Sequence, residues 1–330
     1  MNNISQPHIC FFPTLTVLID DKQEFLDSIT LKLDNQSQSY KLFTNARQAI
    51  EYIKTNYKKS QWFYNHIKSL EEEKQDHKVI ELNIHDIYKQ IYNKDRFDII
   101  TSVIIDYDMP KINGLDVAKE LHDLNLSKIF LTGTADEKLA VGAFNNKLID
   151  GFIAKSSEII YQEIDNRIKE GANLYFKEVS KSVSPYAIGE NNIIISNPQF
   201  IELFNTLISE KNIVEYYMTE SNLSYLFLNK YGRGDMLFLF PNDHLDLMYQ
   251  MAKEENVAKP ILTQLKSKEK MLCFYDFKES TFSFTDNFEP YLVDTKKINF
   301  GGVDYYYGYQ EDVLNDEKAI SFYKFNNKFS

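Results

Sequence analysis

Polar residues that could do chemistry follow four apolar stretches of the chain. The stretches are residues 15–19, 97–105, 129–131 and 152–154, and they lead into Asp20-Asp21, Asp106, Thr132 and Lys155 respectively. Short apolar runs rich in Ile, Val, Leu and Phe are typical of buried strands. Because parallel strands point the same way, their carboxyl ends would bring these polar groups to one edge of a sheet, where open α/β sheets bind ligands.

The residue types at these strand ends favour phosphoryl chemistry. Clustered carboxylates repel one another unless a positive charge lies among them, and Mg²⁺ prefers oxygen ligands while keeping some of its waters. A lysine and a hydroxyl group beside such an ion can neutralise a phosphoryl group and donate hydrogen bonds to it. The sequence therefore predicts a Mg²⁺-dependent phosphoryl site that contains Asp20, Asp21, Asp106, Thr132 and Lys155.

Helical patterns separate the predicted strands. Apolar residues recur at helical spacing in residues 25–33, 46–53, 114–121, 137–146 and 156–182, and a further short strand is expected at 40–43. Five strands that alternate with five helices are typical of a parallel sheet covered on both faces. We therefore expect an α/β fold with a doubly wound, five-stranded parallel sheet.

Residues 14 to about 180 resemble the CheY-like receiver domain of two-component response regulators. The resemblance rests on the acid pair Asp20-Asp21, the pattern Asp-x-x-Met-Pro from Asp106 to Pro110, Gly114 at the start of a helix, Thr132 and Lys155. Each motif is weak alone, but all five occur in order at the expected strand ends. The resemblance implies a flavodoxin-like sheet and a signalling protein that accepts a phosphoryl group and is not itself an enzyme. The lack of a membrane-length apolar run and of a leader pattern in residues 1–13 predicts a cytoplasmic protein.

The resemblance also implies roles for the acids. Asp106 would take a phosphoryl group from a phosphohistidine of a sensor histidine kinase or phosphotransfer protein. Asp20, Asp21 and Asp106 would hold Mg²⁺ together with the backbone carbonyl of Asp108. Asp108 would also place a second carboxylate near the phosphoacceptor, where we expect it to tune the lifetime of the phosphoryl group or access by the kinase.

Three further residues would transmit the signal. The resemblance implies that Lys155 pairs with one phosphoryl oxygen and that Thr132 donates a hydrogen bond to another. Phe152 occupies the aromatic switch position, which reports phosphorylation to the face made by the fourth helix, the fifth strand and the last helix. Phosphorylation would bias an existing two-state equilibrium and promote a homodimer through that face.

Two features depart from the receiver pattern. Ser156 stands where a proline normally follows the lysine, so a cis peptide bond is not expected there. Residues 57–95 form an unusually long insertion with an acidic run at 71–73 and helical spacing of Ile84, Ile87, Tyr88 and Ile91. We expect this insertion to be largely helical and solvated; docking of a partner is the alternative.

A haloacid-dehalogenase-type phosphatase is the rival interpretation of the same residues. Asp106 and Asp108 fit its Asp-x-Asp nucleophile motif, and Thr132 and Lys155 could represent its next two motifs. That family requires a further acidic pair after the lysine, which Ser156-Ser157-Glu158 do not supply. The phosphatase interpretation also leaves Asp20-Asp21 unexplained, and we therefore favour the receiver.

Residues 186–330 are predicted to form a separate α+β output domain. Strands are expected near 215–218, 225–228, 236–240, 271–275, 282–284 and 305–309, with helices at 200–208, 245–254 and 260–265. This pattern favours an antiparallel sheet that resembles PAS-like sensory or interaction domains, and differs from the helix-turn-helix output of many response regulators. Residues 1–13 look like a loose lead-in to the receiver.

The activity of the output domain stays open at the level of sequence. A net charge of −11 disfavours extensive, non-specific binding of nucleic acid, and no apolar run is long enough to span a membrane. The leading hypothesis is binding of another protein or a small ligand; the alternative is a transcriptional regulator whose output domain binds nucleic acid. The long insertion and unusual output are also similar to an atypical response regulator of quorum sensing.

Overall fold

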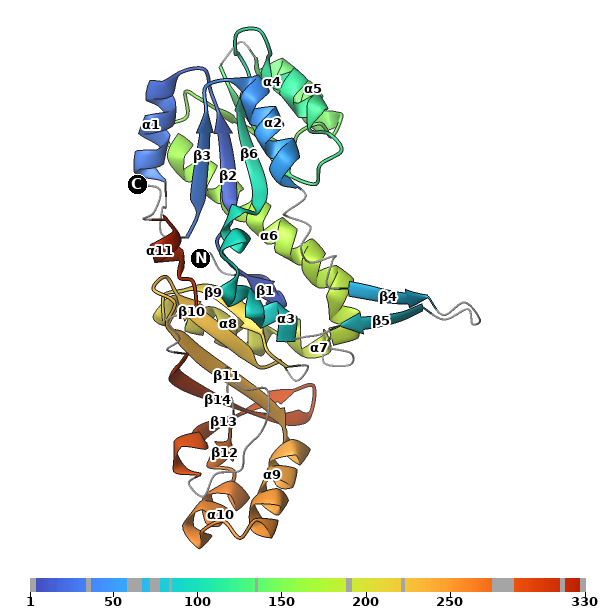
Figure 1. Ribbon diagram of the computed structural model, residues 1–330, viewed down its shortest axis with the longest axis vertical. Coiled ribbons are helices and arrows are strands. Elements are labelled where there is room, and N and C mark those ends of the chain that lie inside the picture. Colours follow the sequence, from blue (N-terminus) through green and yellow to red (C-terminus); the bar gives the residue numbers. More distant parts are fainter. Residues whose placement is uncertain are drawn as a thin grey trace.

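Five parallel strands form the sheet that carries the predicted site (Figure 1). The computed structural model describes residues 4–33, 37–57, 67–71, 78–82, 85–133, 136–187, 192–220, 223–274, 288–314 and 318–326. The strands lie in the order β3-β2-β6-β7-β8, and every neighbouring pair is parallel. Their bounds are β2 (Leu15–Ile19), β3 (Ser39–Phe43), β6 (Ile100–Asp106), β7 (Ser127–Thr132) and β8 (Gly151–Ala154). The predicted flavodoxin-like α/β fold is confirmed.

Helices cover both faces of this sheet, which explains why its central strands are continuously apolar. They are α1 (Gln23–Lys32), α2 (Ala46–Tyr57), α4 (Gly114–Glu120), α5 (Glu137–Asn145) and α6 (Ile160–Ala187). Helices α2, α4 and α5 share one apolar core with the sheet, and α1 and α6 share another on the opposite face. All seven residues of β6 are buried as a result.

The prediction that residues 57–95 are largely helical holds only for the last described part of that range. The structure places an antiparallel hairpin before it, made of β4 (Ile67–Glu71) and β5 (Lys78–Leu82). It is followed by α3 (His85–Tyr88) and the 3₁₀ helices η2 (Lys89–Tyr92) and η3 (Lys94–Asp98). The error has a physical cause, because strand pairing depends on a partner elsewhere in the chain and leaves only a weak local pattern. Ile84 lies outside the described residues.

A seven-stranded antiparallel sheet forms the core of the second part of the chain. Its order is β1-β9-β10-β11-β14-β13-β12. The strands are β1 (Cys10–Phe11), β9 (Ile213–Met218), β10 (Tyr225–Asn229), β11 (Gly234–Pro241), β12 (Lys270–Leu272), β13 (Leu292–Phe300) and β14 (Val303–Leu314). The strand predicted at 282–284 lies outside the described residues, and β13 was not predicted because its sequence is half polar. The likeness to PAS domains stays a prediction.

Short helices flank this second sheet. They are α7 (Asn192–Ile195), α8 (Pro198–Glu210), α9 (Asn242–Glu254), α10 (Lys259–Lys266), the 3₁₀ helix η5 (Glu289–Tyr291) and α11 (Phe322–Asn326). Asn197 caps α8 by accepting a hydrogen bond from the backbone N–H of Gln199 at 2.9 Å, directly before a proline in the first turn. No helix in the described ranges is long and apolar enough to cross a lipid bilayer.

Residues 10–11 are an edge strand of the second sheet and not a loose lead-in. Cys10 pairs with Tyr217 and Phe11 pairs with Tyr216 in an antiparallel ladder. Immediately after this strand, the chain leaves the second sheet and enters β2 of the parallel sheet (Figure 1). The chain therefore contributes β1 to the antiparallel sheet before it contributes β2 to the parallel sheet.

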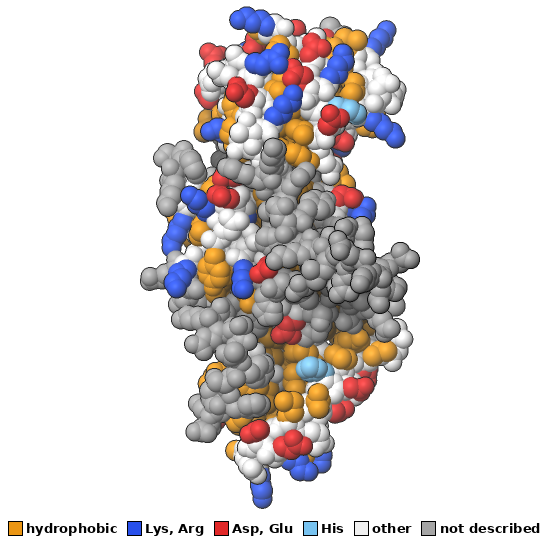
Figure 2. Space-filling view, turned by 45° about the vertical axis from the view of Figure 1, so that its right-hand side comes forward, with side chains coloured by type: hydrophobic (Ala, Val, Ile, Leu, Met, Phe, Trp, Pro, Cys, Tyr) orange, Lys and Arg blue, Asp and Glu red, His pale blue; other side chains and the backbone are white. Residues whose placement is uncertain are grey.

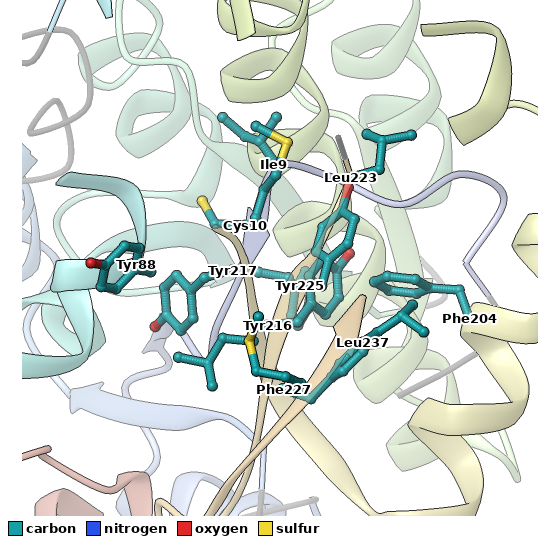
Figure 3. Close-up of a cluster of buried hydrophobic side chains, with 14 of the residues drawn as sticks. Ile9, Cys10, Tyr88, Phe204, Tyr216, Tyr217, Leu223, Tyr225, Phe227 and Leu237 are labelled. Carbon is teal, nitrogen blue, oxygen red and sulfur yellow. The ribbon is translucent and has the colours of Figure 1, made fainter. Parts of the chain in front are cut away.

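One hydrophobic core spans the junction between the two sheets. Figure 3 shows side chains from β1, α3, α8, β9, β10 and β11 gathered into one cluster. The ring of Phe176 in α6 lies 4.9 Å from that of Phe11 and 4.7 Å from that of Phe12, centroid to centroid. Because α6 begins beside the parallel sheet and ends in this core, it joins the two sheets directly.

Candidate functional site

The carboxyl ends of β2, β6, β7 and β8 meet at one edge of the parallel sheet and bring the predicted residues together. Asp20 follows β2 and is fully buried, whereas Asp106 ends β6 with 3% of its surface exposed. Thr132 ends β7, and Lys155 follows β8. Parallel pairing in register explains this convergence, since Asp106 pairs with Leu131 and Thr132 pairs with Ala154.

Three carboxylates form a cluster that suits a divalent cation. Asp20, Asp21 and Asp106 each offer an oxygen, and these oxygens all lie within 4.8 Å of one another. Oδ1 of Asp21 is buried and has no hydrogen-bond partner among the described residues. A buried carboxylate oxygen without a partner is costly unless a cation or a water satisfies it. The oxygen-only donor set fits Mg²⁺.

Lys155 links two of these carboxylates. Its Nζ lies 2.6 Å from Oδ2 of Asp20 and 3.0 Å from Oδ1 of Asp106. Burial lowers the pKa of Lys155, but hydrogen bonds to Asp20 and Asp106 outweigh it, so the pKa is raised overall. Three carboxylates and one ammonium leave a formal charge of −2, which a divalent cation would neutralise.

Burial also affects the carboxyl group of Asp106. It raises the pKa of that group above its usual value, and the neighbouring charge of Asp20 acts in the same direction. The hydrogen bond from Lys155 opposes the rise. Burial and the contact with Lys155 therefore act in opposite directions on the charge state of this carboxyl group.

Thr132 connects the site to strand β8. Its side chain is fully buried, and its Oγ1 donates a long hydrogen bond of 3.4 Å to the carbonyl of Ile153. Its own carbonyl accepts a hydrogen bond of 2.8 Å from the backbone N–H of Lys155. Phe152 lies on the same strand, pairs with Phe130 and is partly buried. The switch roles of Thr132 and Phe152 stay predictions.

The loop after Asp106 requires a glycine at its end. The backbone N–H of Gly114 donates a hydrogen bond of 2.9 Å to the carbonyl of Tyr107. A Cβ atom on Gly114 would lie 2.7 Å from the carbonyl oxygen of Asp106 and 2.9 Å from the Cα of Tyr107. No side chain tolerates such contacts with backbone. The glycine therefore holds the loop and the start of α4 against the end of β6.

Asp108 lies at the surface of this loop. Its side chain is exposed, and its backbone N–H donates a long hydrogen bond of 3.4 Å to Oδ1 of Asp106. The same oxygen of Asp106 is contacted by Nζ of Lys155 at 3.0 Å. The predicted role of the Asp108 carbonyl as a metal ligand stays a prediction. The described residues contain no cis peptide bond, in agreement with the serine after Lys155.

Phe25 is a site residue that the sequence pattern did not reveal. It was expected only as an apolar residue of the first helix. In the structure its ring centroid lies 4.6 Å from Nζ of Lys155, within the range of a cation–π contact. The two residues are 130 positions apart, so no local pattern could pair them.

Comparisons with known proteins agree with this architecture. No family model matches the chain, and no curated protein matches it. The solved structure of the Legionella pneumophila response regulator LqsR shares 27% identity and a TM-score of 0.75, and the match covers 100% of this chain and 98% of that one. A response regulator receiver domain protein from Clostridium thermocellum (16% identity, TM-score 0.33) matches 49% of this chain and 95% of its own.

A CheY-like receiver domain protein from Methanospirillum hungatei also matches, with 17% identity, a TM-score of 0.32, and coverage of 50% of this chain and 98% of its own. These two matches cover only about half of this chain, whereas the match to LqsR spans all of it. The chain has the architecture of a two-component response regulator, with a CheY-like receiver joined to a domain built on an antiparallel sheet.

Proposed function

We propose that the chain is a phospho-accepting response regulator whose phosphoacceptor is Asp106. The observation that carries the proposal is the position of Lys155, whose ammonium bridges Asp20 and Asp106 beside the unpartnered oxygen of Asp21. An oxygen of Asp106 attacks the phosphorus of a phosphohistidine on a sensor histidine kinase or phosphotransfer protein. The P–N bond breaks, and the histidine leaves with the bonding electron pair and takes up a proton.

Asp20, Asp21 and Asp106 would hold Mg²⁺, with the carbonyl of Asp108 as a further ligand. The ion, when bound, neutralises charge on the phosphoryl oxygens. Lys155 pairs with a second phosphoryl oxygen and keeps its contact with Asp20. The hydroxyl of Thr132 turns from the carbonyl of Ile153 towards a third oxygen, a change that its long 3.4 Å hydrogen bond makes inexpensive.

The phosphorylated state would be passed to the face formed by α5, β8 and the start of α6. Four large apolar side chains on and beside α5 and α6 are strongly exposed there: Leu139 (53%), Val141 (43%), Phe144 (47%) and Ile159 (56%). Exposed apolar groups of this size are typical of protein contacts. A phosphorylation-dependent homodimer through this face is part of the proposal, with Phe152 as the reporter.

A phosphatase that uses Asp106 and Asp108 is less well supported. Such an enzyme needs its second aspartate as an acid beside the phosphoryl group, yet the side chain of Asp108 is exposed at the surface. Lys155 contacts Asp20, an acid that the phosphatase interpretation does not use. Only slow self-phosphorylation and self-dephosphorylation are expected of the proposed switch.

The second sheet is proposed to bind another protein or a ligand. On the face shown in Figure 2, basic and acidic side chains are interspersed over the described residues and do not form one basic patch. The net charge of −11 likewise disfavours binding of nucleic acid through many phosphate contacts. Binding of nucleic acid by this region stays the alternative, and a place in a quorum-sensing circuit stays a prediction.

The proposal is tested by incubating the purified chain with phosphoramidate and Mg²⁺ and measuring the intact mass. The wild type should gain one phosphoryl group, and EDTA should abolish the gain. Asp106→Asn should gain none, because the amide is not a nucleophile. The matched variant Asp108→Asn should still be modified; equal modification of Asp106→Asn and the wild type would refute the proposal.

A further inference from the structure

We propose that Phe25 is a positioning residue for phosphoryl transfer, whose ring holds the ammonium group of Lys155 in place while Asp106 exchanges its carboxylate for an acyl phosphate. The inference rests on the proposed function of Asp106. It assigns a role to a residue outside the acid pair, the phosphoacceptor loop, the threonine and the lysine.

The ammonium group of Lys155 is held from three sides. Two sides are the carboxylates of Asp20 and Asp106, at 2.6 Å and 3.0 Å. The third is the ring of Phe25, whose centroid lies 4.6 Å from Nζ. The Lys155 side chain still has 23% of its surface exposed, so the two carboxylates and the ring do not enclose it completely.

The ring matters most when the phosphoryl group arrives. Attack by Asp106 turns one carboxylate oxygen into the bridging oxygen of an acyl phosphate, so Lys155 loses a full carboxylate partner and gains a phosphoryl oxygen. A lysine has a flexible four-carbon stem and much rotamer freedom. Asp20 and the Phe25 ring are the two contacts that remain unchanged through the step, and they keep the ammonium pointed at the transferring group.

The fold places Phe25 by the same turn that places the acid pair. Oδ1 of Asp20 accepts a hydrogen bond of 2.9 Å from the backbone N–H of Lys22, which opens α1. The carbonyl of Lys22 in turn accepts one of 3.1 Å from the N–H of Phe25. The ring packs on the apolar core shared by α1 and α6. These hydrogen bonds therefore fix the ring of Phe25 relative to the carboxylate of Asp20.

The test measures the rate of phosphorylation by phosphoramidate as a function of Mg²⁺ in full-length protein. The P–N bond of phosphoramidate breaks and ammonia leaves, so no kinase contact enters the rate. Phe25→Leu keeps most of the apolar volume but removes the π face, and we expect a rate about threefold to tenfold lower at saturating Mg²⁺. Phe25→Tyr and Phe25→Trp should retain the wild-type rate or nearly so.

A merely structural role of Phe25 predicts a different pattern. Movement of α1 would displace Asp20 and Asp21 and raise the Mg²⁺ concentration needed for half-maximal rate, whereas loss of the ring contact alone leaves it unchanged. Tyr161→Leu is the matched control, because it removes a cation–π contact of 4.1 Å with Lys32 on the same core. This control should keep the wild-type rate.

Fluorinated phenylalanines at position 25 keep the test valid if Phe25→Leu fails to fold. Mono-, di- and trifluorination preserve the ring shape but progressively weaken its negative face. The rate should fall with each fluorine. If the wild type gains no phosphoryl group from phosphoramidate, the proposed function itself is refuted. If the wild type is phosphorylated, and Phe25→Leu or the fluorinated proteins are phosphorylated at the same rate, only the role of Phe25 is overturned.

Discussion

Arg96 of η3 and Glu215 of β9 form an ion pair of 3.0 Å in which neither side chain has any exposed surface. Both Nε and Nη2 of Arg96 donate to the same carboxylate oxygen, Oε2, which also accepts from the hydroxyl of Tyr217 at 2.8 Å. The remaining guanidinium donors bind the carbonyls of Ile91, Asn93 and Ile320. Arg96 directly follows the insertion, whose Ile87, Tyr88 and Ile91 are buried in the core of the second sheet, so the last part of the insertion is not a solvated appendage.

Removal of Arg96 should destabilise the whole chain. Arg96→Met leaves Glu215 buried without its counter-charge, and we expect a loss of about 3 to 5 kcal/mol in the free energy of unfolding. The pair Arg47–Glu120 provides the control, since its side chains are 63% and 33% exposed. Arg47→Met should cost less than about 1 kcal/mol. Equal denaturant midpoints for the two variants would contradict the account.

The double variant Arg96→Met/Glu215→Met separates the charge from the packing. Replacing both partners removes the uncompensated carboxylate, so most of the stability lost in Arg96→Met should return. A double variant that is less stable than Arg96→Met would show that packing around the pair, and not the buried charge, dominates.

Residues 186–330 are not expected to fold when expressed alone. The fragment lacks β1, which covers the edge of β9, and it lacks Arg96. It also exposes core residues that contact Phe11, Phe12 and Phe176. Amide exchange should show little protection in the fragment and strong protection of β9 in the full chain; a cooperatively unfolding, monomeric fragment would contradict this prediction.

Gly114→Ala should slow phosphorylation by at least about tenfold, because its Cβ would displace the carbonyl of Asp106 from 2.7 Å and shift the phosphoacceptor by a fraction of an ångström. Gly142 lies within α5 and has no atom within 4 Å of a Cβ placed there. Gly142→Ala should leave the rate unchanged and stabilise the chain by about 0.5 to 1 kcal/mol. Phosphoramidate labelling and thermal unfolding of the two variants measure both effects, and equal labelling rates would disprove the steric argument.

His8 should make the stability of the chain sensitive to mild acid. Burial, with a smaller contribution from the charge of Lys177, lowers the pKa of His8 to about 4 from its usual 6.5. Between pH 6.5 and 4, His8 is therefore protonated in the unfolded chain and neutral in the folded chain. Its contribution to the free energy of unfolding is fully present above pH 6.5 and is lost as the pH falls towards 4. The loss should approach about 3 kcal/mol at pH 4.

The variant His8→Gln isolates this contribution from the carboxylates that titrate in the same range. The difference in unfolding free energy between wild type and His8→Gln should change with pH between 6.5 and 4. Parallel pH profiles for wild type and His8→Gln would rule out the buried neutral histidine.

Much of the receiver could be predicted from sequence because its information is local. Each strand of the parallel sheet is a short apolar run, and the residue after it is placed at the sheet edge by direction alone. The acid pair, Asp106, Thr132 and Lys155 therefore needed no knowledge of distant contacts. The cluster of Asp20, Asp21 and Asp106 and the bridge by Lys155 follow from this directional rule.

The features that were missed depend on partners far away in sequence. Cys10 and Phe11 are a strand only because β9 lies beside them, more than 200 residues later. Arg96 and Glu215 are separated by 119 positions, and neither is apolar, so nothing local marks them as buried. The hairpin of β4 and β5 was missed for a different reason: its two strands pair with each other, and such short strands leave only a weak local pattern.

The central claim is that Asp106 is the residue that carries the phosphoryl group. The most direct measurement is reduction of the phosphorylated chain with borohydride, which converts an aspartyl phosphate to homoserine, followed by peptide mapping by mass spectrometry. The account predicts homoserine at position 106 only, in a Mg²⁺-dependent yield that Lys155→Ala lowers. Homoserine at Asp20, Asp21 or Asp108, or none after phosphoryl incorporation, would contradict it.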